Sequence, residues 1–176
     1  MRLDCDFYTR DVLDVAPHLV GKLLCHRVGP TVIRGRITEV EAYRGEDDTA
    51  CHARVGRTKR TEVLYMAGGH AYVYLCYGIH NLFNVVTGSE GNPQAVLIRG
   101  LAHIPGPGRL TKALGITLAD NRADLTTSPT LWLEDDQYHP VVDASTRIGI
   151  GYATPQDQAR LWRFTEEESP LRSDQP

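Results

Sequence analysis

The sequence predicts an α+β fold in a single domain, residues 1–176, in which strands dominate and pair antiparallel. The composition, 41% apolar and 23% charged, is that of a globular domain long enough to bury its own core. Two β-rich runs, 71–76 and 82–86, are separated by a short connection and predict a hairpin. The segments between strands do not supply the regular crossover helices that a parallel sheet requires.

The N-terminal part predicts helix followed by strand. Residues 9–24 carry apolar positions at helical spacing and predict one or two short helices. Thr9 is a plausible cap, and Pro17 is expected to start the second helix. Residues 25–28 predict a strand that ends in the turn at Gly29-Pro30.

Residues 31–43 predict a longer strand that passes through a glycine. Because side chains alternate along a strand, Ile37, Glu39, Glu41 and Tyr43 are expected on one face and the intervening residues on the other. This pattern places two carboxylates and an aromatic ring side by side.

The rest of the chain predicts shorter elements. Residues 44–62 are polar and predict a loop with at most a short helix. Residues 94–101 predict a strand, and 106–114 open with Gly-Pro-Gly and predict a helix. Residues 130–134 and 147–152 predict two late, short strands.

Composition excludes several classes of protein. The formal net charge of -3 gives no overall support to nucleic-acid binding. No apolar run approaches the ~20 residues that span a bilayer, and residues 1–6 are too polar for a secretory signal, so we expect an intracellular protein without a membrane partner. The four cysteines lack the spacing of a zinc site, so we expect reduced thiols, no metal and no cofactor.

Glu41 is the first candidate for chemistry. A carboxylate on a half-buried strand is costly unless it is paired or used. The pattern alone favours an ion pair with Arg34, Arg36 or Arg99 over a catalytic role. Glu39 lies roughly 6.5–7 Å away by strand rise, which raises the two-carboxylate arrangement of O-glycoside hydrolases. Two acids on one strand cannot easily flank a bond, so one base and one structural acid is the favoured interpretation.

The tyrosines of the predicted hairpin are the second candidate. Tyr72 and Tyr74 share a face, and Tyr77 lies at the tip, with Ile79 close behind it. Packing in the core explains such rings equally well. The functional interpretation is a wedge that enters a base stack, with Tyr43 and Tyr74 sandwiching an extruded base. Stacking contributes ~1–3 kcal/mol per base, enough to oppose restacking.

Three further features are ambiguous. Asn84 lies on a predicted strand, where Asn is disfavoured. Its side chain either hydrogen-bonds the backbone or faces a purine, whose edge it would recognise by hydrogen bonds or exclude by a clash. From His52 to Arg60 the chain has no acidic residue and four basic ones, Arg54, Arg57, Lys59 and Arg60. On charge alone, this cluster is best explained as a solvated loop. The Gly-Pro-Gly at 106–108 is a weak phosphate-binding signal because it lacks the Lys-Ser/Thr ending of a nucleotide loop.

Taken in order, these residues resemble the alkyladenine (3-methyladenine) DNA glycosylases of the methylpurine type. The resemblance covers most of the chain, from about residue 19 to 164, in these blocks: Arg34-Gly-Arg-Ile-Thr-Glu-Val-Glu-Ala-Tyr43, His52 with Arg57, Gly69-His-Ala-Tyr-Val-Tyr-Leu-Cys-Tyr-Gly78 through Asn84, Ala95-Val-Leu-Ile-Arg99, Gly106 through Ile116, and Arg147-Ile-Gly-Ile-Gly151. It implies one compact mixed α/β domain with a curved antiparallel sheet and a projecting hairpin.

The resemblance also implies roles for individual residues. Glu41 matches the general base that activates water, and Arg99 matches an arginine beside that water. The matched base-pocket residues are Tyr43, His52, Tyr74, Asn84 (thought to exclude the exocyclic amine of guanine) and Ile148. Tyr77 matches the intercalating tyrosine, and Ile79 replaces a residue that is often Met. Thr61 follows Arg60 where the family commonly has Asn, a difference that bears on substrate breadth more than on catalysis.

The implied activity is that of a monofunctional glycosylase in base excision repair, which flips alkylated or deaminated purines from duplex DNA and hydrolyses the N-glycosidic bond. A cationic alkylated purine leaves readily, whereas neutral hypoxanthine needs a donor, for which His52 is a candidate. No lysine lies near these motifs, so we expect no Schiff base and no lyase step.

Binding to double-stranded DNA is expected to depend on the four basic residues after His52, with Arg109 and Lys112 as further phosphate contacts, and to weaken with salt. A monomer is the simplest expectation, located in the cytoplasm with the nucleoid if the source is bacterial. Two rival functions remain open: a non-catalytic nucleic-acid-binding module, which has no use for Glu41, and a nucleosidase, which has no use for a wedge.

Overall fold

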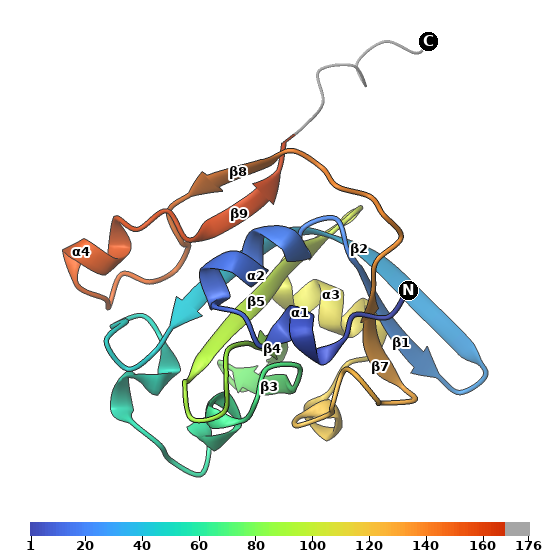
Figure 1. The fold of residues 1–176 in the computed structure, drawn as a ribbon, viewed down its shortest axis with the longest axis horizontal. Coiled ribbons are helices and arrows are strands. Elements are labelled where there is room, and N and C mark those ends of the chain that lie inside the picture. Colours follow the sequence, from blue (N-terminus) through green and yellow to red (C-terminus); the bar gives the residue numbers. More distant parts are fainter. Residues whose placement is uncertain (168–176) are drawn as a thin grey trace.

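A computed structural model of the chain describes residues 1–167, so residues 168–176 of the predicted domain lie outside the described part. Within residues 1–167, nine strands form one curled antiparallel sheet whose main path is β3-β4-β5-β2-β1-β7 (Figure 1). The strands are β1 (Leu23–Val28), β2 (Thr31–Arg44), β3 (Ala71–Cys76), β4 (His80–Val86), β5 (Gln94–Leu101), β6 (Ile104–Pro105), β7 (Leu131–Glu134), β8 (Val142–Ser145) and β9 (Arg163–Glu166). The predicted α+β class and its curved antiparallel sheet are confirmed.

Helices are few and short. The α-helices are α1 (Cys5–Tyr8), α2 (Val12–Leu19), α3 (Pro107–Leu114) and α4 (Pro155–Gln158), and three 3-10 helices are η1 (His52–Val55), η2 (Thr61–Tyr65) and η3 (Leu118–Asp120). None of the helices in the described range has the length and apolarity needed to cross a bilayer. The segment 44–62, predicted as a loop with at most a short helix, contains η1 and the first residues of η2. Of the basic residues that follow His52, Arg54 lies on η1 and the other three lie between these two short helices.

The N-terminal helices begin at aspartates that the sequence analysis did not select. Asp4 caps α1 by accepting a bond from the Phe7 amide, and Asp11 caps α2 by accepting one from the Leu13 amide. The prediction that Thr9 is an N-terminal cap is wrong, because Thr9 ends α1. The prediction that Pro17 starts the second helix is also wrong, since that helix begins at its Asp cap and Pro17 lies inside it.

The helical pattern predicted up to residue 24 stops earlier. After α2, Gly21 adopts a φ of +92°, a conformation that ends the helix and turns the chain. Leu23 and Leu24 therefore belong to β1 and pair with Arg36 and Gly35 of β2.

Strand β2 is the long central element, and a bulge within it decides which side chains reach the site. The register with β5 shifts on both sides of Glu39. Because a bulge adds a residue, it reverses the alternation beyond it. Ile37 consequently packs in the main core with Val40, whereas Glu39 and Glu41 both approach Arg99. The prediction that Ile37 shares the face of Glu41 is wrong for this reason.

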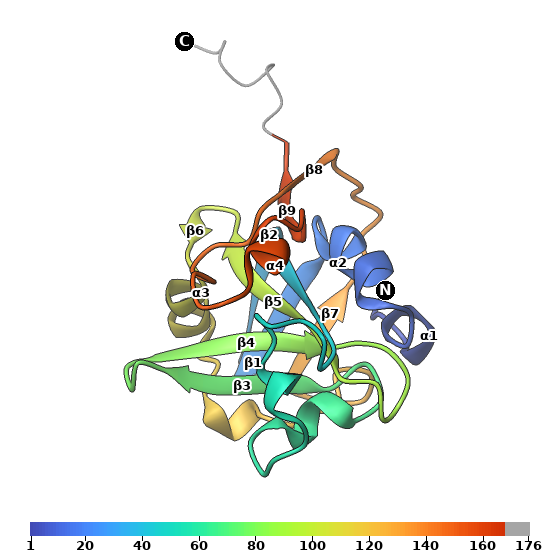
Figure 2. The same ribbon diagram turned by 90° about the vertical axis from the view of Figure 1, so that its left-hand side faces the viewer.

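The β3–β4 hairpin extends beyond the body of the molecule (Figure 2). Its tip is a tight turn in which the Ile79 amide donates to the Cys76 carbonyl at 3.1 Å, and Tyr77 and Gly78 have φ values of +51° and +67°. Positive φ at both central residues is the signature of a type I′ turn. The hairpin is braced close to its tip by α3, where the Thr111 hydroxyl donates to the carbonyl of Asn81, which pairs with Leu75. The projecting hairpin is confirmed.

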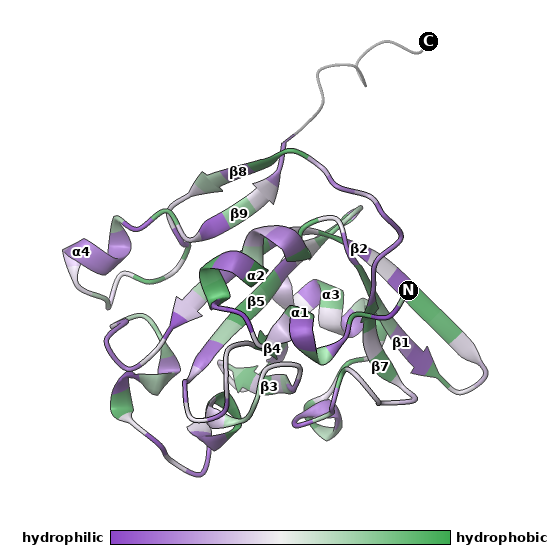
Figure 3. Ribbon diagram, viewed as in Figure 1, coloured by the Kyte–Doolittle hydropathy of each residue, from purple (hydrophilic) through white to green (hydrophobic). Residues whose placement is uncertain are grey.

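The main core lies between the sheet and the helices. α2 contributes Val12, Val15, Ala16 and Leu19, all buried, and packs against β2 and β5. Figure 3 shows hydrophobic colour along β5 and alternating hydrophobic and hydrophilic bands on α2. Such an apolar stripe is what a helix needs to lie on a sheet.

The C-terminal part differs from the prediction. Residues 147–152, predicted as a strand, form bends and turns, and the pair β8 and β9 flanks them instead. Gly149 has a φ of +73°, which a regular strand does not allow. The Ile148 amide donates to the side chain of Glu41 on β2 instead of to the backbone of a neighbouring strand. This segment therefore runs past the C-terminal part of β2, where the candidate site lies.

Candidate active site

Glu41 is a fully buried carboxylate, with 0% of its surface exposed, near the end of the long strand β2. Its Oε1 accepts a hydrogen bond from the Tyr43 hydroxyl at 2.8 Å, and its Oε2 accepts one from the Ile148 amide at 2.6 Å. The Arg99 Nε lies 3.7 Å from Oε2. Both oxygens are thus held in place, and each retains a further lone pair that can accept a proton.

Glu39 and Glu41 are neighbours with opposite electrostatic environments. Burial would raise the pKa of Glu39, but bonds from Arg163 and Arg99, at 2.7 and 2.8 Å, lower it. For Glu41, burial raises the pKa more than the Ile148 amide, Arg99 and the Tyr43 hydroxyl lower it. Paired groups with diverging pKa values are the usual arrangement for acid–base work. Glu41 is therefore the better proton acceptor of the two.

The ion-pair partners considered for Glu41 lie elsewhere or are shared. Arg34 pairs with Glu134, and Arg36 pairs with Asp136. Only Arg99 lies near Glu41, and its shorter contact is with Glu39. An ordinary ion pair therefore does not account for the burial of Glu41.

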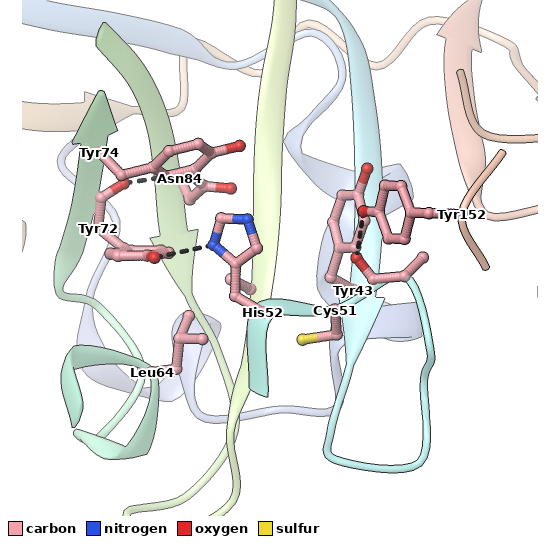
Figure 4. Close-up of a pocket in the computed structure, with 10 residues that line it drawn as sticks. Tyr43, Cys51, His52, Leu64, Tyr72, Tyr74, Asn84 and Tyr152 are labelled. Atoms are coloured by element: carbon pink, nitrogen blue, oxygen red, sulfur yellow. Dashed lines mark hydrogen bonds between the residues drawn. The ribbon is translucent and has the colours of Figure 1, made fainter. Parts of the chain in front are cut away.

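An aromatic cavity of about 50 Å³ adjoins Tyr43, the ring that donates to this carboxylate; Glu41 and Arg99 are not among its lining residues. It is lined by Tyr43, Ala50, Cys51, His52, Leu64, Tyr72, Tyr74, Asn84, Ala95 and Tyr152. Figure 4 shows Tyr72, Tyr74 and Asn84 on one side, Tyr43 and Tyr152 on the other, and His52 between them. Four of the five residues assigned to a base pocket, Tyr43, His52, Tyr74 and Asn84, thus come together.

Ile148, the fifth, is not among the lining residues of the cavity. Its side chain is about half exposed, at 48%, and its backbone amide is the group that contacts Glu41. The structure therefore places the peptide group of Ile148, rather than its side chain, at the candidate site.

His52 is held as a neutral imidazole. Its Nδ1 lies 2.9 Å from the Tyr72 hydroxyl, and its ring meets that of Tyr74 edge-on with centroids 4.6 Å apart. Burial, together with the charges of Arg60 and Arg54, lowers the pKa of His52 to about 4. A neutral ring keeps one N–H donor, so His52 can offer a hydrogen bond without a charge.

Asn84 is fixed by the strand beside it. Its side-chain amide donates to the Tyr72 carbonyl at 3.1 Å, and the residue is buried. The backbone bond considered from sequence therefore exists, and it also sets the orientation in which Asn84 faces the cavity.

The hairpin tip presents two large apolar side chains to solvent. Tyr77 is 92% exposed and Ile79 is 74% exposed. A left-handed backbone is unusual for a bulky residue such as Tyr77 and persists only where the surroundings impose it. The tip is distant in sequence from Glu41 and is not part of the cavity.

The basic loop is organised by stacking on three aromatic rings, two of which, Tyr74 and Tyr152, line the cavity. Arg54 lies over Tyr152, Arg57 over Tyr65 and Arg60 over Tyr74, with 5.0, 4.6 and 5.3 Å from guanidinium carbon to ring centroid. All three arginines and Lys59 are exposed. Thr61, which stands where Asn was expected, is buried and donates to the Gly56 carbonyl, so it holds this loop together.

Sequence reasoning missed several residues of the site. The strand pattern predicts only that Tyr72 shares a face with Tyr74, whereas in the structure its hydroxyl bonds His52. Tyr152 lines the cavity and donates to the Ala50 carbonyl at 2.9 Å, and only its nearness to the matched block at 147–151 could have indicated it. Arg147 belongs to the same matched block, but the resemblance assigns it no role.

Among residues 1–167, no group of three or more His, Cys, Asp or Glu side chains is placed to hold a metal ion. Cys51 lines the cavity, but burial raises the pKa of its thiol to about 11, so it is not an activated nucleophile. The arrangement instead offers a water-activating carboxylate next to a stacking pocket with a neutral donor.

Comparisons with known proteins agree with this geometry. A family model described as methylpurine-DNA glycosylase (MPG) matches residues 6–105 and 101–170. The chain is similar to three proteins each named "Putative 3-methyladenine DNA glycosylase". That of Borrelia garinii subsp. bavariensis is 43% identical, covering 92% of this chain and 94% of the relative. Those of Methanocella arvoryzae and Sodalis glossinidius are 42% and 44% identical, covering 96% and 92% of this chain and 94% and 95% of the relatives.

Proposed function

The chain belongs to the methylpurine-DNA glycosylase family, and on that premise we propose that it flips alkylated or deaminated purines out of duplex DNA and hydrolyses their N-glycosidic bond with water activated by Glu41. Family membership makes it a DNA-repair glycosylase, a hydrolase of base excision repair that acts on alkylated purines in DNA. Flipping, deaminated substrates and the roles of individual residues are our proposal.

The placement of Glu41 carries the proposal. A buried carboxylate with both oxygens hydrogen-bonded, beside an aromatic cavity, is expensive to build unless it does chemistry. Its raised pKa brings the carboxylate closer to neutral pH, where a general base works best. In this scheme Glu41 takes a proton from water and stabilises positive charge developing on the sugar, while Arg99 orients the same water.

The leaving base decides how much further help is needed. A cationic alkylated purine leaves without an acid, so one carboxylate suffices. Neutral hypoxanthine needs hydrogen bonding at its ring, and His52 can donate through its imidazole or its backbone amide without gaining a charge. Asn84, fixed by the Tyr72 carbonyl, is proposed to exclude the exocyclic amine of guanine.

The cavity must widen to accept a base. Its volume of about 50 Å³ is well below the roughly 150 Å³ of an engineered cavity that binds benzene, a smaller ring than a purine. Tyr43 on one side and Tyr74 on the other would part and sandwich the base. Arg54 and Arg60 stack on Tyr152 and Tyr74, two of the rings that line the cavity, and exchange of ring contacts for phosphate contacts would release these walls.

DNA binding is assigned to one face. The exposed Tyr77, with Ile79 behind it, would fill the gap left by the extruded nucleotide. The four basic residues after His52, Arg54, Arg57, Lys59 and Arg60, would contact phosphates, with Arg109 and Lys112 as further candidates. One such face suits a monomer on duplex DNA, and cytoplasmic DNA of the nucleoid is the proposed location in a bacterial host.

We also propose that the enzyme lacks lyase activity. Strand cleavage through a Schiff base needs an amine at the sugar, and no lysine lines the cavity within the described part of the chain. The product would be an intact strand with an abasic site.

The test is incubation with duplexes that each carry a single 1,N6-ethenoadenine or hypoxanthine, followed by detection of abasic sites and of strand breaks without added alkali. Abasic sites in unbroken strands are expected. Binding without base release would indicate the non-catalytic module, and release from free nucleosides but not from duplexes would indicate a nucleosidase. Either result, or spontaneous strand breaks, would contradict the corresponding part of the proposal.

A further inference from the structure

Arg147 is a buried cation that the proposed chemistry does not use. Its Nη1 donates to the Ala42 carbonyl at 3.0 Å and to Asp48 Oδ2 at 2.7 Å, and its Nη2 donates to Asp48 Oδ1 at 3.0 Å and to the Asp157 carbonyl at 3.3 Å. The Arg147 and Asp48 side chains are only 0% and 1% exposed. A two-pronged ion pair of this kind fixes both the position and the plane of a guanidinium.

The plane of that guanidinium lies against two rings. Its carbon is 4.9 Å from the ring centroid of Tyr43 and 5.0 Å from that of Trp162. The Ala42 carbonyl that it binds belongs to the residue between Glu41 and Tyr43. Arg147 therefore holds the backbone and the ring of the segment that carries the candidate base.

The same arginine controls the second contact of Glu41. Ile148 directly follows Arg147 in the chain, and its amide donates to Glu41 Oε2. Asp48 is in turn fixed by the Arg44 and Ala50 amides, at 3.0 and 3.1 Å. The segment at 147–148 is thus tied to the end of β2 and to the loop that follows it.

We propose that Arg147, anchored by Asp48, is a positioning residue that fixes the two hydrogen-bond donors of Glu41, the Tyr43 hydroxyl and the Ile148 amide. The inference rests on the proposed function, because it assigns Arg147 a role in the reaction of Glu41. Stability alone is a weak explanation, since a buried ion pair often stabilises no more than apolar side chains of the same volume. The Arg147 Nε also finds no partner among the described residues, so the site is not arranged to satisfy every donor.

Arg147→Lys tests this geometry, because lysine keeps the positive charge but lacks the planar guanidinium that donates two parallel hydrogen bonds. The matched control is Arg36→Lys, on the strand that carries Glu41. Arg36 forms a similar two-pronged pair with Asp136, at 3.0 and 2.6 Å, donates to the Gly21 carbonyl and stacks on Tyr138 at 4.6 Å. In none of these interactions does Arg36 contact the Tyr43 hydroxyl or the Ile148 amide, the two groups that donate to Glu41.

The assay is single-turnover release of hypoxanthine from a duplex between pH 5 and 9. Arg147→Lys should lower the rate at neutral pH by about 10²-fold, the loss typical of a misplaced catalytic group. It should also move the acid limb to higher pH, because Glu41 loses groups that favour its charged form, while binding to the duplex changes by less than about threefold. Arg36→Lys should leave both the rate and the limb unchanged.

A second readout does not depend on activity. The titration of the Glu41 carboxyl carbon, followed by NMR, should shift to higher pH in Arg147→Lys and not in Arg36→Lys. If Arg147→Lys does not fold, Asp48→Asn removes the anchor while keeping its shape and should give the same loss of rate at neutral pH. An unchanged Glu41 titration in the folded variant, or equal losses in Arg147→Lys and Arg36→Lys, would overturn the inference. A wild-type protein that releases no base would instead refute the proposed function, and the titration would still decide whether Arg147 positions Glu41.

Discussion

The hydroxyl of Tyr43 offers a direct way to perturb the candidate base without disturbing the pocket. Tyr43→Phe keeps the ring, and hence the wall of the cavity and the stack on Arg147, but removes the 2.8 Å hydrogen bond to Glu41 Oε1. Because that bond stabilises the carboxylate, its loss raises the pKa of Glu41 further than burial already does.

The size of the effect follows from the bond. A hydrogen bond to a buried charged group contributes about 1.5–3 kcal/mol, and about 1.4 kcal/mol corresponds to a tenfold change in a protonation equilibrium. A base works only when ionised, so the acid limb of the pH–rate profile should move to higher pH by about one to two pH units. At high pH, where Glu41 is ionised in both proteins, the rates should converge.

The assay is single-turnover release of hypoxanthine from a duplex across pH 5 to 9, with Tyr72→Phe as the control. Tyr72 is also a pocket tyrosine, but its hydroxyl bonds His52 rather than Glu41, so this variant should leave the acid limb in place. A Tyr43→Phe profile that is merely lower at every pH, with an unmoved limb, would refute the reasoning.

Three further predictions concern His52, the stability cost of Glu41 and the hairpin tip. Because burial lowers the pKa of His52 to about 4, its ring signals in NMR should show no titration between pH 5 and 8; a midpoint near 6.5 would contradict this environment. Glu41→Gln should raise Tm at pH 8: the raised pKa means that stability is lost as Glu41 ionises in the folded state, and each ~1 kcal/mol regained corresponds to about 2–4 °C. The gain in Tm of Glu41→Gln over the wild type should shrink near pH 4. A lower Tm of the variant at pH 8 would contradict the inference that the buried, ionised Glu41 destabilises the fold. Tyr77→Ser should slow release from duplexes about tenfold or more but spare single strands, and equal losses on both would argue against a wedge.

Local patterns in the sequence predicted much of the fold. Residues 94–101 form β5 at the predicted positions, and 71–76 form β3, because β-branched and aromatic runs bounded by turn residues leave little ambiguity. The helix boundaries failed where two signals competed. Pro17 resembled a helix start, but the cap at Asp11 lies six residues earlier and sets the boundary.

The bulge at Glu39 could not be predicted from alternation. It depends on pairing between β2 and β5, which are far apart in sequence, and it moves Ile37 into the core while Glu41 stays near Arg99. A strict period of two breaks where a register shift intervenes.

The candidate site was likewise predicted where it depends on local patterns and missed where it depends on contacts between distant segments. Its rings and its carboxylate fall on strands and were found from spacing and resemblance. The Ile148 amide that donates to Glu41 and the Asp48 anchor of Arg147 were not, because each contact joins positions about 100 residues apart. Such contacts follow from topology and leave no local pattern.

The central claim, that Glu41 activates the water that releases the base, is tested most directly by comparing Glu41→Gln with the wild type. The measurement is single-turnover base release from a duplex with one 1,N6-ethenoadenine, alongside the dissociation constant for the same duplex. Glutamine keeps the size of the side chain and an acceptor for the Ile148 amide but cannot take a proton. The account predicts no detectable release with binding changed by less than about threefold, whereas turnover at a rate near that of the wild type would contradict it.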